Sequence, residues 1–321
     1  MAQVQLKQSA MAGIELNDEL ATGVNSAAIQ ERVREYWNSK PCDSDLSDRE
    51  PLSREYFLEI EQRRYSLQPH IPALLSKIDW SGKRVLEIGA GVGTDARAII
   101  GKGGIYTGIN IDRASTEATA QALHVFALPG SVRQCDATAI PFPSGTFDVV
   151  YAFGVLHHIA DARKAVAEVH RVLKPGGEFL TMLYNRASIN YIIEIMFLRK
   201  LGLYALEVPG ATALLGRMGF PRDKIERHKA LHRSKRRISY SEWLSRNTNG
   251  PDNPYAQVFG AREAAQLLEP FQIVSNDVYF FDHRHWGLLG KLVPTRARSV
   301  LGRAWGWHRI VHARKVADPD G

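Results

Sequence analysis

A glycine-rich turn follows the first strongly apolar run of the chain and is the segment best suited to bind a ligand. From Glu87 to Thr94 the sequence reads EIGAGVGT, with glycines at 89, 91 and 93. Glycine lets the backbone turn sharply and approach a bound molecule closely, because it has no Cβ. A dinucleotide-binding turn would carry its third glycine at position 94, where this chain has Thr. The spacing disfavours a nicotinamide dehydrogenase, although any tight strand-to-helix connection also favours glycine.

Polar side chains follow the next two apolar runs, at 105–109 and 131–135. The carboxyl ends of parallel strands meet at the edge of a sheet where ligands bind. A carboxylate or amide oxygen there can accept hydrogen bonds from hydroxyl and amino groups of a ligand. The residues at these two ends are Asn110, Ile111, Asp112, Asp136 and Ala137.

Three further residues are candidates for chemistry on a substrate. His157 and His158 follow the apolar run at 147–152, and Asn185 follows the run at 178–184. Histidine titrates near neutral pH and can take a proton from a reacting group. The alternative is that the two histidines only hold their loop or line a pocket. Asn185 lies at the same edge, where it would orient a substrate.

The elements that must position these residues alternate between strand and helix from residue 84 to residue 184. Five short apolar runs have the character of buried strands, and the segments between them have helical spacing. Short connections between such elements indicate right-handed βαβ crossovers and a parallel, doubly wound sheet. The predicted strands are 84–88, 105–109, 131–135, 147–152 and 178–184, and the predicted helices are 95–101, 116–124 and 161–173.

The alternation has helical flanks on both sides. Before it, the spacing predicts helices over 29–38, 53–65 and 71–78. After residue 185 a long helical and loop-like stretch follows, which is too long for a simple connection and indicates an inserted cap. A helix over 261–268 and strands over 271–281 and 307–315 then suggest an antiparallel closing hairpin.

The segment VLEIGAGVG at 85–93 resembles the first motif of class I S-adenosylmethionine-dependent methyltransferases. In that family this loop passes the methionine part of the cofactor, which assigns Glu87, Gly89, Ala90, Gly91 and Gly93 to cofactor binding. The order of the later motifs agrees with the resemblance. FDVVYAFGVLHH at 147–158 is similar to the fourth strand and its loop, and RVLKPGG at 171–177 is similar to the turn before the fifth.

The resemblance also implies roles for the polar residues at the strand ends. The family usually has an acid for the ribose hydroxyls where this chain has Asn110, and Asp112 two residues later could supply the missing acceptor. Asp136 matches the acid near the adenine amino group, and Ile111 and Ala137 accompany these positions. Asp95, Tyr65 and Phe153 are the remaining cofactor candidates. Asp95 could instead compensate a helix dipole, and Tyr65 could simply pack.

The predicted fold class is α/β, a seven-stranded doubly wound Rossmann-like sheet with N-terminal helices and an inserted helical cap. Five segments make up the chain. They are a flexible leader at 1–25, an N-terminal helical lid at 26–80, an S-adenosylmethionine-binding core at 81–185, an inserted substrate cap at 186–258, and a C-terminal part of the core with closing antiparallel strands at 259–321.

The net charge of +7 is unevenly distributed. The segment 222–237 has eight Lys or Arg against two acids, and 283–315 has eight with no acid. Such segments suit nucleic acid, anionic lipid or an anionic substrate, or form a solvated helix face. Cys42 and Cys135 are the two cysteines, so no metal-ligand set is expected and a reducing cytoplasm is favoured. No apolar stretch approaches the ~18 residues of a spanning helix.

These features predict an S-adenosylmethionine-dependent methyltransferase that acts on a small biosynthetic molecule by in-line displacement. An RNA methyltransferase that uses the two basic segments is one alternative, and a non-catalytic cofactor-binding relative is another. No RNA-binding motif is recognisable. We expect a cytoplasmic monomer or homodimer without a transmembrane segment, with peripheral membrane contact left open. The acceptor atom (O, N, S or C) does not follow from the sequence.

Overall fold

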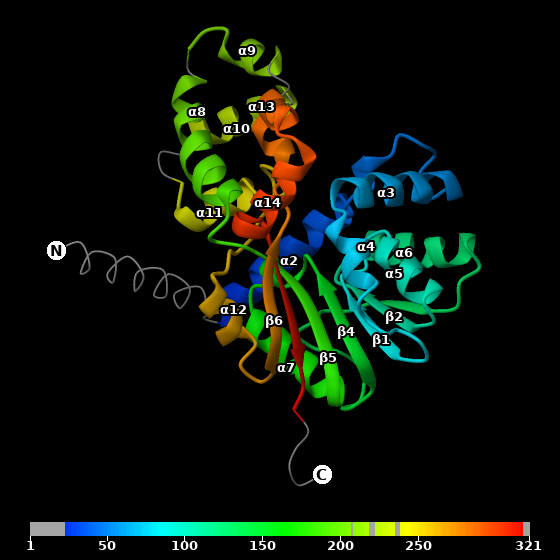
Figure 1. Cartoon of the computed structure of the whole chain (residues 1–321). Helices are drawn as coiled ribbons and strands as arrows, with labels where there is room; N and C mark the ends of the chain where they lie inside the picture. The colour runs from blue at the N-terminus through cyan, green and yellow to red at the C-terminus, as the bar shows by residue number, and fades with distance from the viewer. Residues whose placement is uncertain (1–22, 207, 218–221, 235–237, 317–321) are drawn as a thin grey trace, which may run out of the picture.

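The computed structural model describes residues 23–206, 208–217, 222–234 and 238–316, and its N-terminal part is helical (Figure 1). Ser53 caps one of these helices as its spacing predicts, since its hydroxyl accepts a hydrogen bond from the Tyr56 amide at 3.1 Å. Most of the predicted leader lies outside the described residues. The N-terminal elements are α2 (Gly23–Ser39), η1 (Ser44–Leu46), α3 (Arg54–Leu67) and α4 (His70–Leu75).

A seven-stranded sheet forms the centre, in the order β3-β2-β1-β4-β5-β7-β6. The first five strands are parallel to their neighbours, and β7 is antiparallel to both β5 and β6. The predicted fold class is therefore confirmed. The strands are β1 (Arg84–Ile88), β2 (Ile105–Asn110), β3 (Ser131–Gln134), β4 (Phe147–Phe153), β5 (Leu173–Tyr184), β6 (Gln272–Tyr279) and β7 (His308–Arg314). Strand β5 begins earlier than predicted, because Leu173 pairs with Phe147 ahead of a register irregularity.

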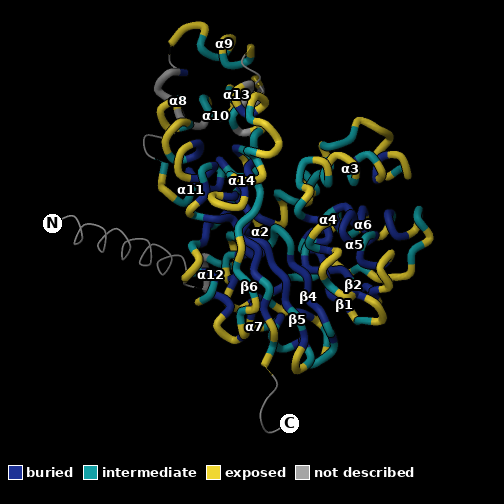
Figure 2. Tube along the Cα trace, in the orientation of Figure 1, coloured by how far each residue is buried: buried dark blue, intermediate teal, exposed yellow. Residues whose placement is uncertain are grey.

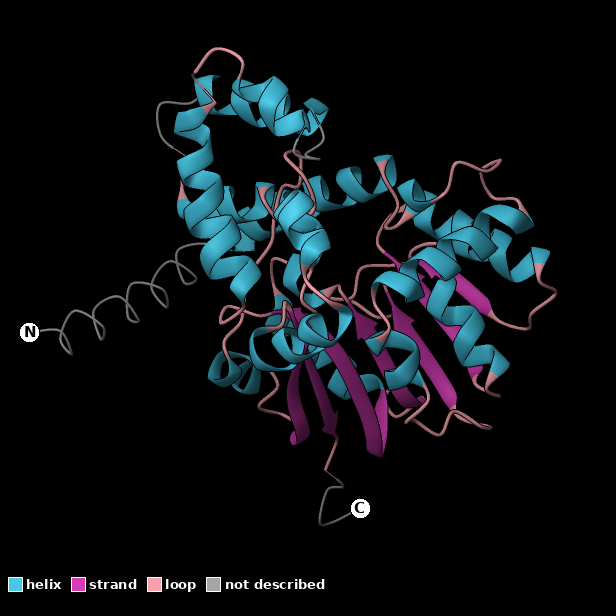
Figure 3. Ribbon diagram, turned by 45° about the horizontal axis from the view of Figure 1, so that its top comes forward, coloured by secondary structure: helices cyan, strands magenta, loops and turns pink. Residues whose placement is uncertain are grey.

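Helices cover both faces of the sheet, and successive strand residues supply the two cores (Figure 3). Leu86 and Val150 pack in a cluster with α7 and α12, whereas Val85 and Val149 pack in a second cluster with α4 and α5. Strands β1, β4, β5 and β7 are accordingly buried over most of their length, whereas the edge strands β3 and β6 are exposed or half-buried (Figure 2). The elements around the sheet are α5 (Thr94–Gly101), α6 (Arg113–Val125), η2 (Leu156–His158), α7 (Ala162–Val172) and α12 (Ala261–Leu267).

A separate helical lobe stands beyond the carboxyl end of the sheet (Figure 1). Its first part, between β5 and α12, corresponds to the inserted cap that the sequence predicts. A second part, between β6 and β7, lies beside it, with η4 in contact with η3. The lobe consists of η3, a π-helix (Asn190–Leu198), α8 (Arg199–Ala205), α9 (Ala211–Arg217), α10 (Arg222–Ser234), α11 (Tyr240–Arg246), η4 (His283–Trp286), α13 (Gly287–Leu292) and α14 (Thr295–Trp305).

The predicted closing hairpin is wrong in its connection, although the antiparallel pairing is confirmed. β6 and β7 pair from Gln272↔Arg314 to Tyr279↔His308, but the chain passes through η4, α13 and α14 between them. A hairpin turn would have placed the two strands side by side through a few residues. The basic and apolar alternation at 284–305 is helical instead, and α14 presents its charges outward.

Two isoleucines of different burial should contribute very differently to the free energy of unfolding. Ile99 on α5 is fully buried, whereas Ile105 on β2 is 60% exposed. Ile99→Ala should lower the free energy of unfolding by about 2–5 kcal/mol, because it leaves a cavity in the core. Ile105→Ala, the matched control, should change it by about 0.5 kcal/mol or less. Urea unfolding of both variants measures the difference, and equal losses would contradict the packing described here.

Candidate active site

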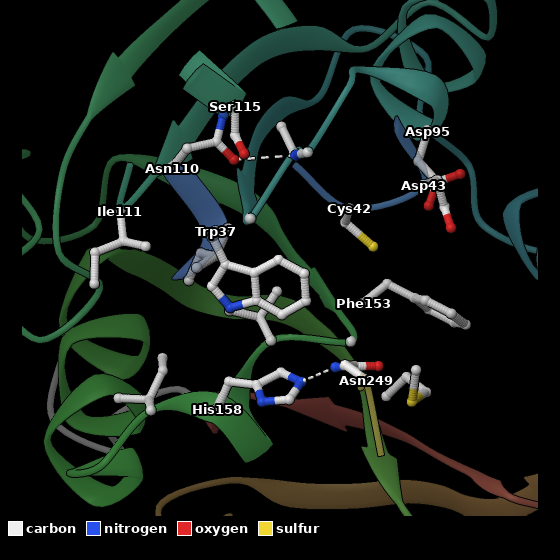
Figure 4. A pocket seen from close by; sticks show the side chains of 18 of the residues that line it. Trp37, Cys42, Asp43, Asp95, Asn110, Ile111, Ser115, Phe153, His158 and Asn249 are labelled. Atoms are coloured by element: carbon white, nitrogen blue, oxygen red, sulfur yellow. Dashed lines mark hydrogen bonds between the residues drawn. The ribbon is translucent and has the colours of Figure 1, made fainter. Parts of the chain in front are cut away.

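One cavity of about 250 Å³ lies at the carboxyl ends of β1, β2 and β4 and extends past the end of β5 (Figure 4). Most residues predicted to bind a ligand line it. These are Glu87, Gly89, Ala90, Gly91, Asp95, Asn110, Ile111, Asp112, Ala137, Phe153 and His158. Five predicted residues do not line it, namely Tyr65, Gly93, Asp136, His157 and Asn185.

The glycine turn needs glycine for two separate reasons. Gly89 and Gly91 have φ values of 75° and 58°, in the left-handed region that side chains disfavour. A Cβ at Gly89 would also lie 2.3 Å from Cγ2 of Val155. A Cβ at Gly91 would extend toward Cys42, another cavity residue, at 3.7 Å. The turn therefore keeps backbone, not side chains, at the cavity wall.

Asn110 fastens this turn to the helix that follows β2. Its Oδ1 accepts a hydrogen bond from the Gly91 amide at 3.0 Å (Figure 4). Its Nδ2 donates to Oγ1 of Thr119 at 3.4 Å. A carboxylate could accept the first bond but could not donate the second. The hydrogen bonds to Gly91 and Thr119 thus explain why position 110 has an amide side chain and not a carboxylate. Whether it also contacts a ribose stays a prediction.

Asp112 begins α6 and also lines the cavity. Its Oδ1 accepts a hydrogen bond from the Ser115 amide at 2.7 Å, which makes it the N-cap of the helix. Burial raises the pKa of this carboxyl above its ordinary value. Because a carboxylate has further acceptor sites, Asp112 can cap the helix and still accept a hydrogen bond from a ligand.

Asp95 joins the N-terminal helices to the sheet. Its carboxylate accepts hydrogen bonds from Arg64 at 2.8 Å, Tyr65 at 2.9 Å and Tyr151 at 2.9 Å, and it is only 2% exposed. Tyr65 therefore acts on the cavity through Asp95 and does not line it. The Asp95 charge and burial together raise the pKa of Glu87 to about 8, with burial the larger cause.

Asp136 lies just past the end of β3 and does not line the cavity. Its Oδ1 accepts a hydrogen bond from the Thr138 amide at 2.8 Å, which turns the chain locally. Its neighbours Cys135 and Ala137 line the cavity instead. Gly93 is the N-cap of α5 and lies in sequence between Gly91 and Asp95, which both line the cavity. Contacts of Asp136 and Gly93 with a cofactor remain predictions that this arrangement does not support.

The two adjacent histidines have different surroundings. His157 is fully buried and stacks on Tyr184 with ring centroids 3.7 Å apart. The His158 Nδ1 lies 2.7 Å from the Tyr255 carbonyl, to which it must donate, and its Nε2 lies 2.7 Å from Nδ2 of Asn249 (Figure 4). Both nitrogens of His158 are therefore engaged, and the ring is held in its neutral form. Burial lowers its pKa to about 4.

Asn185 is also occupied by the protein itself. Its Nδ2 donates to the Gly306 carbonyl at 2.8 Å, and its Oδ1 accepts from Arg309 at 2.9 Å. The side chain is 1% exposed, so it joins β5 to β7 and does not face a substrate. Catalytic roles for His157 and Asn185 stay predictions that their burial argues against.

The far half of the cavity contains residues that sequence reasoning did not select. Asn249, from the helical lobe, accepts from the Tyr184 hydroxyl at 2.9 Å through Oδ1 while it donates to His158. Tyr36 on α2 donates to the Asn249 carbonyl at 2.8 Å. These bonds close the cavity from three elements distant in sequence. Much of the wall here is aromatic, formed by Trp37, Tyr184, Phe280, Trp307 and His308, and Asp282 and Arg284 also line it.

Little in the sequence marked these residues. Asn249 lies in a loop of Gly, Pro and Asn, and His308 opens a strand that resembles any closing strand. Their contacts join segments that are far apart along the chain, which local periodicity does not report. Among the described residues, no group of three or more His, Cys, Asp or Glu could hold a metal ion.

The fold and the cavity define a class of protein. A family model described as a methyltransferase domain matches residues 86–181, which include the glycine turn and β4. This match identifies a methyltransferase domain at residues 86–181, and the order of the strands in the sheet agrees with the order of the sequence motifs. The matched segment excludes the N-terminal helices and the helical lobe.

Individual relatives agree over the same region. A ubiquinone biosynthesis O-methyltransferase of Thiobacillus denitrificans is 30% identical over 119 residues, 36% of this chain and 50% of that protein. A ubiquinone/menaquinone biosynthesis C-methyltransferase of Psychromonas ingrahamii is 36% identical over 122 residues, which are 34% of this chain and 48% of that protein. The chain thus spans about half the length of these two curated relatives.

A solved structure extends the similarity to the fold as a whole. The geranyl diphosphate C-methyltransferase of Streptomyces coelicolor A3(2) superposes with a TM-score of 0.52 at 14% identity. The match covers 90% of this chain and 98% of that one. At this identity the likeness shows the fold alone.

The neutral, doubly bonded His158 predicts a pH effect on stability. Its pKa is about 4 in the folded protein against an ordinary 6.5, so between these values the unfolded chain binds a proton that the native protein does not. Stability should therefore fall as the pH drops from 6.5 toward 4, with a contribution of up to about 1.4 kcal/mol per pH unit from this residue.

His158→Asn should remove that contribution, so its unfolding free energy should depend less on pH over this window than that of the wild type. Urea unfolding across the window measures both slopes. His124→Asn, at an exposed position, is the control for loss of a histidine. Equal slopes in the wild type and His158→Asn would refute the neutral, buried state.

Proposed function

We propose that this protein transfers a methyl group from S-adenosylmethionine to a small-molecule acceptor. The observation that supports it most is a continuous cavity, which joins the glycine turn at one end to an aromatic wall at the other. The first half suits a cofactor, and the second is enclosed by α2, β5, β7 and the helical lobe. Enclosed, partly apolar cavities are typical of small-molecule sites.

The residues present fit the cofactor. Glycine at 89 and 91 keeps side chains off the turn, because a Cβ at Gly89 would collide with Val155 and one at Gly91 would extend toward Cys42. Asp112 and Asn110 offer oxygens at the end of β2, and Ile111, Ala137 and Phe153 offer apolar surface. Bound S-adenosylmethionine would supply a methyl group on a positively charged sulfur. The protein then has mainly to orient the acceptor in line and exclude water.

The roof of the cavity, which Asn249, Tyr184, His158 and Tyr36 form, excludes water. Asn249 ties the helical lobe to Tyr184 and His158, and Tyr36 adds a bond from α2. With these bonds formed, the aromatic wall is closed over by side chains from the lid and the lobe. His158 contributes as a positioning residue, because both of its nitrogens are engaged in holding the roof.

The RNA methyltransferase alternative receives less support from the placement of the basic segment 283–315. Arg284 pairs with Asp282 at 2.8 Å, and Arg298 donates to three backbone carbonyls. Arg309 and Lys315 also donate to groups of the protein itself. Much of this charge is therefore used within the fold. Nucleic-acid binding would require an exposed cationic surface and would weaken steeply with salt.

Membrane contact, the number of subunits and a cytoplasmic location stay predictions. Within the described part of the chain, none of the helices has the length and apolar character needed to cross a bilayer. The relatives that act in quinone biosynthesis make a hydroxylated or carbon-acid aromatic compound a reasonable first acceptor to test.

Calorimetry of S-adenosylmethionine and S-adenosylhomocysteine binding tests the proposal. The wild type should bind in the micromolar range, roughly −8 kcal/mol. Gly89→Ala should weaken binding at least tenfold, because its Cβ would collide with Val155 and displace the turn. Gly82→Ala is the matched control, since Gly82 also has a positive φ, 67°, but nothing within 4 Å of its Cβ.

The control should bind as the wild type does, and circular dichroism should show that all three proteins are folded. Failure of the folded wild type to bind either ligand would remove the methyltransferase proposal and favour the non-catalytic alternative. Equal weakening in both glycine variants would attribute the effect to backbone strain and not to the ligand site.

A further inference from the structure

Two histidines from opposite ends of the chain meet at the aromatic end of the cavity. His70 begins α4 and His308 begins β7, 238 residues apart, and Nε2 of His70 lies 2.9 Å from Nδ1 of His308. His308 lines the cavity although it is only 4% exposed. Its Nε2 has no hydrogen-bond partner within the described part of the chain. This nitrogen is therefore available to a ligand.

The surroundings of the pair keep both rings neutral. His70 stacks on Tyr279 with centroids 6.0 Å apart and planes 7° apart, and Phe280 lies 4.6 Å from His308. Burial lowers the pKa of His70 to about 3 and that of His308 well below its ordinary value. In a neutral pair one inner nitrogen donates and the other accepts.

Several charged and titratable groups face the pair from the elements packed around it. Besides burial, the charge of Arg64 on α3 lowers the pKa of both rings. His70 and Arg284 lower the pKa of His308 further. Asp282 acts in the opposite direction on His308. His157, behind Tyr184, is also coupled electrostatically to His308.

We propose that His308 is the general base of this site and that it takes the proton of a phenolic or enolic hydroxyl, with His70 as its positioning residue. The inference rests on the proposed methyl transfer and names the acceptor class for it. The arrangement requires Nδ1–H of His308 to donate to Nε2 of His70. The lone pair of His308 Nε2 then points to the cavity, where it accepts a hydrogen bond from the acceptor hydroxyl.

The step balances without any further reactant. The O–H bond of the acceptor breaks and an N–H bond forms at His308 Nε2, while the oxygen electron pair makes the new O–C bond and the C–S pair remains on sulfur. The developing negative charge on oxygen and the shared hydrogen bond to His70 both stabilise the imidazolium that results. The net products are the methyl ether, S-adenosylhomocysteine and one proton, which passes to solvent.

The walls favour a flat and neutral acceptor. Tyr184 and Trp307 stack with ring centroids 4.3 Å apart, and Trp37 lies across the cavity from Phe153 (Figure 4). The two cationic side chains of the described lining are both paired. Arg64 binds Asp95 and Asp43, and Arg284 binds Asp282. A phosphate or carboxylate on the acceptor would therefore meet cations that already have carboxylate partners.

Nitrogen NMR of the ligand-free protein tests the geometry independently of activity. With ¹⁵N-labelled histidine, His308 should show the tautomer protonated at Nδ1. His70→Phe removes the acceptor and should shift His308 toward the Nε2–H tautomer, whereas His70→Gln keeps an acceptor and should restore it. A wild-type His308 protonated at Nε2 would overturn the proposal.

A pair of probes tests the acceptor class in the complex with S-adenosylhomocysteine. The wild type should bind 4-nitrophenol about tenfold more tightly than 4-nitroanisole, which lacks the hydroxyl proton. His308→Phe should abolish this preference and His70→Phe should reduce it, with partial rescue in His70→Gln. His312→Phe, on the same strand but bonded to Glu178, is the matched control and should keep it.

The outcomes separate this inference from the proposed function. Binding of S-adenosylhomocysteine by all variants, with a preference that depends on His308, supports both. If His308→Phe binds S-adenosylhomocysteine and still prefers 4-nitrophenol to 4-nitroanisole as the wild type does, that result overturns the role of His308 as general base. His308→Gln replaces this variant if it does not fold. No preference in the wild type overturns the acceptor class, and failure of the wild type to bind S-adenosylhomocysteine overturns the methyltransferase itself.

Discussion

The buried carboxylate of Asp95 is the interaction on which the site depends. It stands at the start of α5, beside the glycine turn, and binds Arg64 and Tyr65 from the lid and Tyr151 from the sheet. A buried charge is tolerable only when such partners surround it, and loss of one partner is strongly destabilising. The lid therefore cannot shift without exposing an uncompensated charge, and the shape of the cavity follows from that constraint.

The sequence predicts the parallel half of the fold well, because β1 to β5 and their helices are local and strongly periodic. Leu86 and Val85 point to opposite cores, as alternation along a buried strand requires. The connection between β6 and β7 was not predictable in the same way. Helices such as α14 carry many charges, so their sequence pattern resembles that of a solvated segment. They belong to the same helical lobe as helices that precede β6, and local periodicity does not report this association.

The histidines show why residue type alone does not assign a role. His158 has the spacing of a catalytic residue but is engaged at both nitrogens by Tyr255 and Asn249. His308 lies in an unremarkable strand, yet its Nδ1 is hydrogen-bonded to His70 and the residue lines the cavity. Only the fold brings these partners together, since they are 91 to 238 residues apart in sequence. The glycine turn was the exception, because its function depends on backbone geometry within one short segment.

The order of the strands has a consequence for how the site comes into being. β7 lies between β5 and β6 in the sheet although it follows both in sequence, so a gap must stay open beside β5 until the last strand arrives. Trp307 and His308 enter the cavity wall with that strand. A chain made from its N-terminus can thus form the glycine turn and β1 to β5 first and complete the aromatic wall last. The cavity would then reach its final shape only when the sheet is closed.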